Sequence, residues 1–95
     1  MSGDILMPEI TWNPLKNKRL KKVRGVSFEE ILQAKLVAIE KHPVVAHQNI
    51  MLFDYKEHIW IVPFVENKET IFLKTLYPSW KYTKRHKKGG YREED

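Results

Sequence analysis

The sequence predicts a single α+β domain in which two N-terminal helices pack on one face of a three- to four-stranded antiparallel sheet and a short C-terminal helix follows. Two observations predict this class. Helix-capping residues occur twice within the first 30 positions. Beyond residue 49, apolar residues form short runs separated by polar turns, which is typical of strands. We expect the domain to span residues 10–88, between a flexible N-terminus (1–9) and a flexible tail (89–95).

The first helix is predicted to begin at Pro14 and to end near Arg24. Asn13 is a favourable N-cap, and proline is preferred at the first helical position. Gly25 supplies the left-handed residue that commonly ends a helix.

A second helix is predicted from Phe28 up to Pro43, which cannot continue it. Ser27 and Glu30 have the spacing of a capping box. The apolar residues that follow recur at helical spacing and form one stripe: Phe28, Ile31, Leu32, Leu36 and Ile39.

Strands are predicted over residues 50–53, 59–65 and 70–76, with 44–48 as a candidate fourth strand at the edge. The run 59–65 is apolar throughout, as in a strand covered on both faces. Pro78 and Ser79 are expected to end the sheet, and Ser79 caps a last helix over 80–88 that ends at Gly89-Gly90. Trp12 and Trp60 are expected in the core.

Composition narrows the function classes. The chain has no cysteine, so disulfides and thiolate metal sites are excluded and a reducing compartment is expected. Residues 1–8 lack the features of a signal peptide, and no apolar stretch approaches the roughly 20 residues that span a bilayer. The 4 histidines have no metal-ligand spacing with Asp or Glu. We therefore expect a cytoplasmic protein with no membrane partner, no metal and no cofactor.

The basic residues are concentrated in two blocks. Most of the 17 Lys and Arg residues fall in residues 16–24 and 74–92, and neither block contains an acid. The net charge is +5. Cations gathered around one small core form a positive surface, and the commonest partner of such a surface is a phosphate backbone.

Several segments together resemble the BrnT family of toxin proteins. They are Thr11-Trp12-Asn13 with the Lys/Asn-rich helix that follows, and the segments 24–30, 62–65, 71–75 and 77–84. They cover most of residues 10–86. The resemblance implies a fold similar to the RelE-like ribonucleases. It also implies a cytoplasmic toxin of a type II toxin–antitoxin pair that cleaves RNA without metal or cofactor. Its implied partner is a DNA-binding antitoxin, held in a hetero-oligomer.

The chain departs from the BrnT pattern at Trp80. Family members usually have Arg just before the Lys that corresponds to Lys81. An indole cannot replace a guanidinium electrostatically, so Trp80 either attenuates the enzyme or serves as a platform for stacking a base.

Metal-independent RNA cleavage needs a base for the 2′-hydroxyl, cations for the phosphorane charge and an acid for the leaving 5′-oxygen. The candidates are cations of the C-terminal block and the one histidine among them, which titrates near neutral pH: Lys74, Lys81, Arg85 and His86. Candidates for RNA binding are aromatic residues that can stack a base and neighbouring cations: Tyr77, Trp80, Tyr82, Lys84, Lys22 and Arg24.

Other interpretations remain open. The lysines and Arg85 are also compatible with a solvated surface, and the tyrosines with packing against the sheet. The chain can be a basic module that binds nucleic acid or an antitoxin without catalysis. A weaker hypothesis is a helix-turn-helix built on the first two helices, although few groove-reading side chains occur between Phe28 and Ala38.

Overall fold

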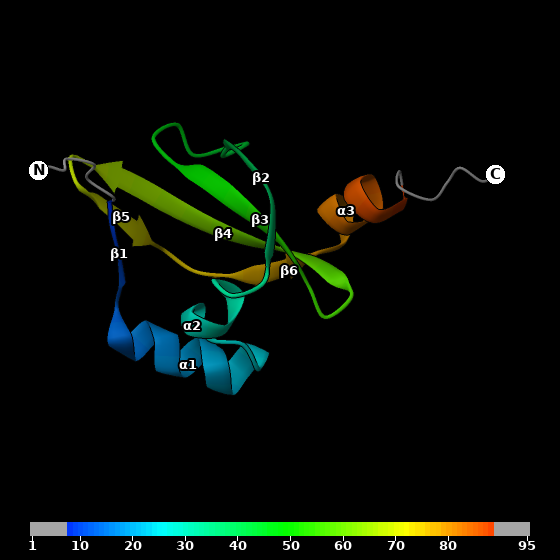
Figure 1. Ribbon diagram of the computed structural model, residues 1–95, viewed down its shortest axis with the longest axis horizontal. Helices are drawn as coiled ribbons and strands as arrows, with labels where there is room; N and C mark the ends of the chain where they lie inside the picture. Colours follow the sequence, from blue (N-terminus) through cyan, green and yellow to red (C-terminus); the bar gives the residue numbers. More distant parts are fainter. Residues whose placement is uncertain (1–7, 89–95) are drawn as a thin grey trace, which may run out of the picture.

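Strand β4 (His58–Asn67) lies at the centre of a mixed, six-stranded sheet. The computed structural model describes residues 8–88. The order of the sheet is β1-β5-β4-β3-β2, and β6 also pairs with β4 (Figure 1). β1 runs parallel to β5, whereas the other pairs are antiparallel. The remaining strands are β1 (Glu9–Trp12), β2 (Lys35–Lys41), β3 (Asn49–Tyr55), β5 (Thr70–Leu73) and β6 (Tyr77–Ser79).

β4 is buried on both faces, as its apolar run predicts. Residues 59–64 are all buried. On one edge β4 pairs with β3 from Tyr55↔His58 to Asn49↔Phe64. On the other edge it pairs with β5 and then with β6. The hairpin between β3 and β4 turns at Lys56 and Glu57, whose φ angles of 48° and 68° lie in the left-handed region. Two such residues form the tight turn whose geometry matches the right-handed twist of the flanking strands.

Helix α1 (Pro14–Arg24) has the bounds predicted from its capping residues. The Asn13 side chain accepts hydrogen bonds from the backbone N–H groups of Leu15 and Lys16. Gly25 has a φ of 78° and donates its N–H to the Lys21 carbonyl. Only Leu20 of this helix is buried, so α1 contributes one apolar contact and an otherwise solvated, cationic surface.

The predicted second helix is wrong beyond its first turn. The capping box of Ser27 and Glu30 forms, but α2 spans only Phe28–Ile31. After a short turn, the chain forms β2, which contains only the last two residues of the predicted apolar stripe, Leu36 and Ile39. Leu36 and Ile39 then pair with Phe53 and Met51 of β3. The β-branched residues of this segment suit a pleated surface, and the ladder with β3 outweighs their helical spacing.

The predicted architecture of two helices on a three- to four-stranded antiparallel sheet, and with it the RelE-like assignment, is therefore wrong. The sheet has six strands and is mixed because residues 9–12 add a parallel strand. Residues 44–48 form a loop rather than a strand. The predicted strand 70–76 ends at Leu73, and the chain pairs again with β4 through β6. β6 contains Pro78, which is tolerated there because β6 lies at an edge.

The C-terminal helix is also shorter than predicted. Helix α3 covers Trp80–Thr83, and a π-helical segment follows over Lys84–Lys88. The expected helix end at Gly89-Gly90 and the predicted flexible tail (89–95) lie outside the described residues. Of the predicted flexible N-terminus (1–9), residues 1–7 also lie outside them, and Glu9 begins β1.

The two faces of the sheet have separate cores. Figure 1 shows α1 and α2 together on one side of the sheet and α3 apart from them. On the α1–α2 face, Phe28 and Ile31 pack with Trp60, Val62 and other apolar residues. On the opposite face, Tyr82 of α3 packs with Ile50, Leu52, Ile59 and Ile61. Trp60 is in the core as predicted, and Trp12 is half-buried against it.

Glu30 joins α1, α2 and β3. Its Oε1 accepts from Lys21 Nζ at 2.8 Å and from the Ser27 N–H at 2.9 Å. Its Oε2 accepts from the Tyr55 hydroxyl at 3.4 Å. The hydrogen bond from Lys21, followed by that from the Ser27 backbone, lowers the pKa of Glu30 from 4.5 to about 2. Asn17 adds a second link, because it accepts from the Phe28 N–H and donates to Glu29.

We predict that Glu30 stabilises the fold in a pH-dependent way. Because its pKa of about 2 in the folded state lies below its ordinary value of 4.5, the ionised group stabilises the protein above pH 4.5. This stabilisation is lost as the pH falls through the window from 4.5 towards 2. In urea melts, Glu30→Gln should therefore lower the midpoint at pH 7, and the difference from the native chain should shrink to nothing near pH 2. Glu66→Gln, which removes an exposed carboxylate, is the charge-matched control. An equal difference at both pH values would refute the prediction.

No helix among residues 8–88 is long and apolar enough to cross a membrane.

Candidate functional site

Helix α3 is fixed to the sheet by one buried hydroxyl. The Thr83 hydroxyl donates to the Ser79 carbonyl at 2.6 Å and accepts from the Ile59 N–H at 2.8 Å. Ser79 also caps the helix, because its side chain accepts from the Tyr82 N–H, as predicted from the sequence. These bonds hold the residues after Ser79 beside the start of β4.

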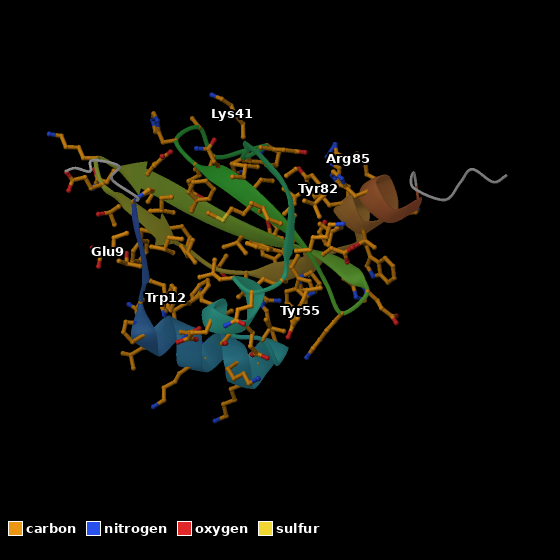
Figure 2. All side chains as sticks on the ribbon, viewed as in Figure 1. Glu9, Trp12, Lys41, Tyr55, Tyr82 and Arg85 are labelled. Atoms are coloured by element: carbon orange, nitrogen blue, oxygen red, sulfur yellow. The ribbon has the colours of Figure 1, made fainter. Side chains whose placement is uncertain are left out.

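A cluster of polar and aromatic side chains lies where α3 meets β2. The Arg85 guanidinium lies over the Tyr82 ring, 4.5 Å from its centroid. The His86 ring stacks on the Tyr82 ring, with the two centroids 6.3 Å apart. Figure 2 shows Tyr82 and Arg85 side by side at α3. We call Glu40, Tyr82, Arg85 and His86 the α3 cluster.

Glu40 is the member of the α3 cluster that the sequence did not indicate. Its carboxylate oxygens lie 3.9 Å from Arg85 Nη2 and 3.9 Å from His86 Nε2. Glu40 was placed on the predicted second helix, where nothing linked it to the C-terminal block. On β2, Glu40 pairs with Ile50, whose side chain belongs to the α3-side core, so the carboxylate faces α3. The signal that indicates this position is the pair of β-branched residues Val37 and Ile39, which favour a strand.

The Nε2 atom of His86 is buried and has no hydrogen-bond partner among the described residues. At 3.9 Å, the Glu40 oxygen is beyond hydrogen-bonding distance. A buried polar atom without a protein partner is unusual in a folded protein, and such an atom commonly meets a water molecule, an ion or a ligand. His86 is therefore the most distinctive polar group of the candidate site.

Two of the aromatic candidates lie beside the α3 cluster. Trp80 is 72% exposed, and its ring meets the His58 ring edge-on with the centroids 5.1 Å apart. Tyr77 is half-buried and packs on the same core as Tyr82. Burial, and then the nearby Tyr82, raise the pKa of Tyr77, while Arg24 opposes this shift. The Tyr77 hydroxyl therefore keeps its proton at neutral pH and can donate a hydrogen bond.

The lysine candidates are exposed. Lys74 lies just after β5 rather than within a strand, and its Nζ is 5.6 Å from the Phe72 ring centroid. Phe72 alternates with Leu73 of the α1–α2 core, so Lys74 lies on the side of the sheet where α3 packs. Lys81 is on α3, whereas Lys84 begins the π-helical segment. The α-helical spacing expected to align Lys81, Lys84 and Arg85 is therefore not maintained through this segment.

Lys22 and Arg24 lie on α1, across the sheet from α3. The predicted site residues thus form two groups. One group lies on the α3 side of the sheet and contains Lys74 and the site residues of β6, α3 and the π-helical segment. The other group lies on the α1 side and contains Lys22 and Arg24. Arg24 links the groups, since it is close enough to Tyr77 to affect its pKa.

The described residues 8–88 contain no group of three or more His, Cys, Asp or Glu side chains that could hold a metal ion. Comparisons of the chain with models of protein families, with curated proteins and with solved structures found no match.

We predict that α3 depends on the Thr83 hydroxyl. Thr83→Val keeps the shape of the side chain but leaves the Ile59 N–H without its acceptor, which should cost about 1–3 kcal/mol of unfolding free energy. A urea melt would measure this loss, and proteolysis should show earlier cleavage after residue 79. Thr70→Val, in half-buried β5, is the matched control. Equal stability of the two variants would contradict the role given to Thr83.

Proposed function

We propose that this chain is the toxin of a type II toxin–antitoxin pair, similar to the BrnT family, and a metal-independent RNA endonuclease of the cytoplasm. The observation that supports this most directly is the α3 cluster, in which a histidine with an unpartnered buried nitrogen lies beside an arginine and a tyrosine. Exposed lysines and Trp80 lie on the same side of the sheet. The C-terminal residues of the family resemblance are those that build this side.

The proposed reaction is a transesterification within RNA. The 2′-oxygen attacks the adjacent phosphorus as a base removes its proton, and the bond to the 5′-oxygen breaks as that oxygen gains a proton. The products are a 2′,3′-cyclic phosphate and a 5′-hydroxyl. His86 is suited to the proton transfers, since histidine can gain and lose a proton near neutral pH. Arg85, Lys81 and Lys74 are suited to the charge that develops on the phosphorane oxygens.

Glu40 bears on whether the enzyme is active. Its carboxylate already lies 3.9 Å from Arg85 and from His86, the same groups that a phosphate would need. RNA must therefore compete with Glu40 or displace it. The position of Glu40 and the presence of Trp80 in place of an arginine both favour the alternative hypothesis. In that hypothesis the chain is a non-catalytic module that binds nucleic acid or an antitoxin.

We predict that Trp80→Arg increases any cleavage activity, because a guanidinium replaces an exposed indole beside the phosphate-binding cations. Growth after tightly induced expression, with RNA ends mapped by primer extension, would compare the native chain and this variant. In whichever background is active, His86→Gln should lower the cleavage rate by about 10²–10⁴-fold. Lys68→Gln, in the turn between β4 and β5, is the charge control.

Three outcomes separate the hypotheses. Arrest and cleavage by the native chain would establish an active toxin in which Trp80 is tolerated. Activity in Trp80→Arg alone would indicate an attenuated toxin. If neither chain cleaves RNA, the ribonuclease proposal fails and the binding module becomes the leading hypothesis.

A protein partner is supported by a separate surface. β2 is an edge strand, so one side of its backbone lacks a neighbouring strand. Of the large apolar residues exposed among residues 8–88, most lie on or just after this strand: Leu36, Val37, Ile39, Val44 and Val45. We propose that the antitoxin covers this edge by adding an apolar strand to it.

We predict that Leu36→Lys and Ile39→Lys, which replace side chains 47% and 56% exposed, abolish this pairing without unfolding the chain. Co-purification after co-expression with the product of the adjacent reading frame would measure it. Leu15→Lys, at an exposed apolar site on α1, should leave co-purification intact. Equal capture of all three variants would exclude the β2 edge as the docking surface.

A further inference from the structure

A groove lined by cations runs along α1, on the side of the sheet opposite α3. Its volume is about 330 Å³, and its lining residues are Lys16, Arg19, Leu20, Val23, Arg24 and Thr75. The residues from α1 recur at spacings of three and four, so they form one face of the helix. Thr75 comes from the segment between β5 and β6 and forms the opposite wall. Lys16 and Arg19 did not stand out in the sequence because the whole first block is basic.

The polar residues that line the groove are hydrogen-bond donors that are either positively charged or neutral. Three of its six lining residues are cationic, Thr75 adds a hydroxyl, and none is acidic. Two cations of the described chain, Lys21 and Arg85, have carboxylate partners in Glu30 and Glu40. No ion pair within residues 8–88 involves a cation of this groove. Unneutralised cations facing one groove raise the local concentration of anions there.

We propose that this groove binds the phosphodiester backbone of single-stranded RNA, at a site separate from the α3 cluster. The proposal rests on the proposed function for the choice of RNA as the nucleic acid. Arginine matches the geometry of phosphate oxygens with two parallel N–H donors, and Lys16 adds a point charge. From Lys16 to Arg24 the helix rises about 12 Å, so the donors follow a chain of phosphates rather than a single ion.

The position of Arg24 connects the groove with the candidate cleavage site. Arg24 lies at the C-terminal end of α1, and its charge partly opposes the rise in the pKa of Tyr77 that burial and Tyr82 cause. Tyr77 in turn belongs to the core that contains Tyr82. β6 is an edge of the sheet, so a strand of RNA can pass around this edge from the groove to the α3 cluster. The groove would then hold RNA that flanks the scissile bond.

The lining chemistry favours RNA over an acidic segment of a protein. The core of a protein–protein interface is generally rich in aromatic residues and poor in lysine, whereas this groove contains Lys16 and no aromatic residue. The apolar residues of the groove are Leu20, which is buried, and Val23. The larger set of exposed apolar residues lies along the β2 edge. The two surfaces thus suit different partners.

The test compares two double variants of equal charge. Lys16→Gln with Arg19→Gln alters the groove, and Lys18→Gln with Lys68→Gln removes the same charge elsewhere. Each protein is titrated into a fluorescent, 2′-O-methylated single-stranded RNA of mixed sequence, which cannot be cleaved, at several salt concentrations. Circular dichroism confirms the fold of each variant.

The groove variant should bind RNA more weakly than the control variant at every salt concentration. Its slope of log affinity against log salt should be smaller by about 1.4, from roughly 0.7 per phosphate contact.

Equal losses in the two double variants would overturn the proposal, because binding would then reflect net charge alone. Tighter binding of the native chain to duplex DNA, or to an acidic peptide, would overturn the assignment to single-stranded RNA. Cleavage assays keep this result apart from the ribonuclease hypothesis. Groove-dependent binding, with no cleavage by either the native chain or Trp80→Arg, would support the groove and refute the nuclease. Cleavage of RNA, together with unchanged RNA affinity in the groove variant, would support the nuclease and refute the groove.

Discussion

The burial of β4 on both faces determines the rest of the structure. Residues 59–64 of this strand are shielded by α1 and α2 on one side and by α3 on the other, so two separate cores depend on one segment. Its two edges are occupied by β3 and by β5 with β6. Because side chains alternate along the strand, each neighbouring residue of β4 supports a different core. A slip of one residue would exchange the two sets and disrupt both cores.

This arrangement separates the charged surfaces from the apolar one. α1 offers a single buried leucine to the core, which leaves its other faces free for cations. The α3 cluster lies against the opposite face, where Glu40 partly balances Arg85 and His86. The β2 edge extends beyond the cover of α1 and α2, so Leu36 and Ile39 remain exposed although they pair with core residues of β3. The surfaces that we propose for RNA and for a protein partner are thus separate on this small domain.

The sequence predicted the local features better than the long-range ones. Asn13, Gly25, Ser27 and Glu30 act through neighbours within a few residues, and their capping roles are confirmed. The apolar run of β4 was also recognised, since burial on both faces leaves a continuous signal. β2 was missed because a bulge between Leu36 and Ala38 disturbs the alternation of the strand, and the residues fit a helical stripe instead. β1 and β6 are too short to show a pattern of their own, and each forms only by pairing with a distant strand.

The candidate site was also predicted only in part, because its arrangement depends on contacts between distant segments. The basic blocks were visible in the sequence, but their division between two sides of the sheet depends on the strand order. Glu40 became part of the α3 cluster only through the register of β2 on β3. Thr83 was not noticed because one buried hydroxyl, bonded to both Ser79 and Ile59, has no sequence pattern.

The parallel pairing of β1 with β5 has a consequence for how the chain reaches its native state. Glu9 pairs with Thr70, so β1 cannot pair until the chain has been synthesised through β5, about 60 residues later. At typical elongation rates of about 5–20 residues per second, β1 remains without its partner strand for several seconds during synthesis. Closing so long a loop is slow compared with forming the local β3–β4 hairpin. During this interval α1 has its caps but no sheet beneath Leu20. Any cationic surface on α1 is therefore exposed to the surrounding RNA before the domain that supports it is complete.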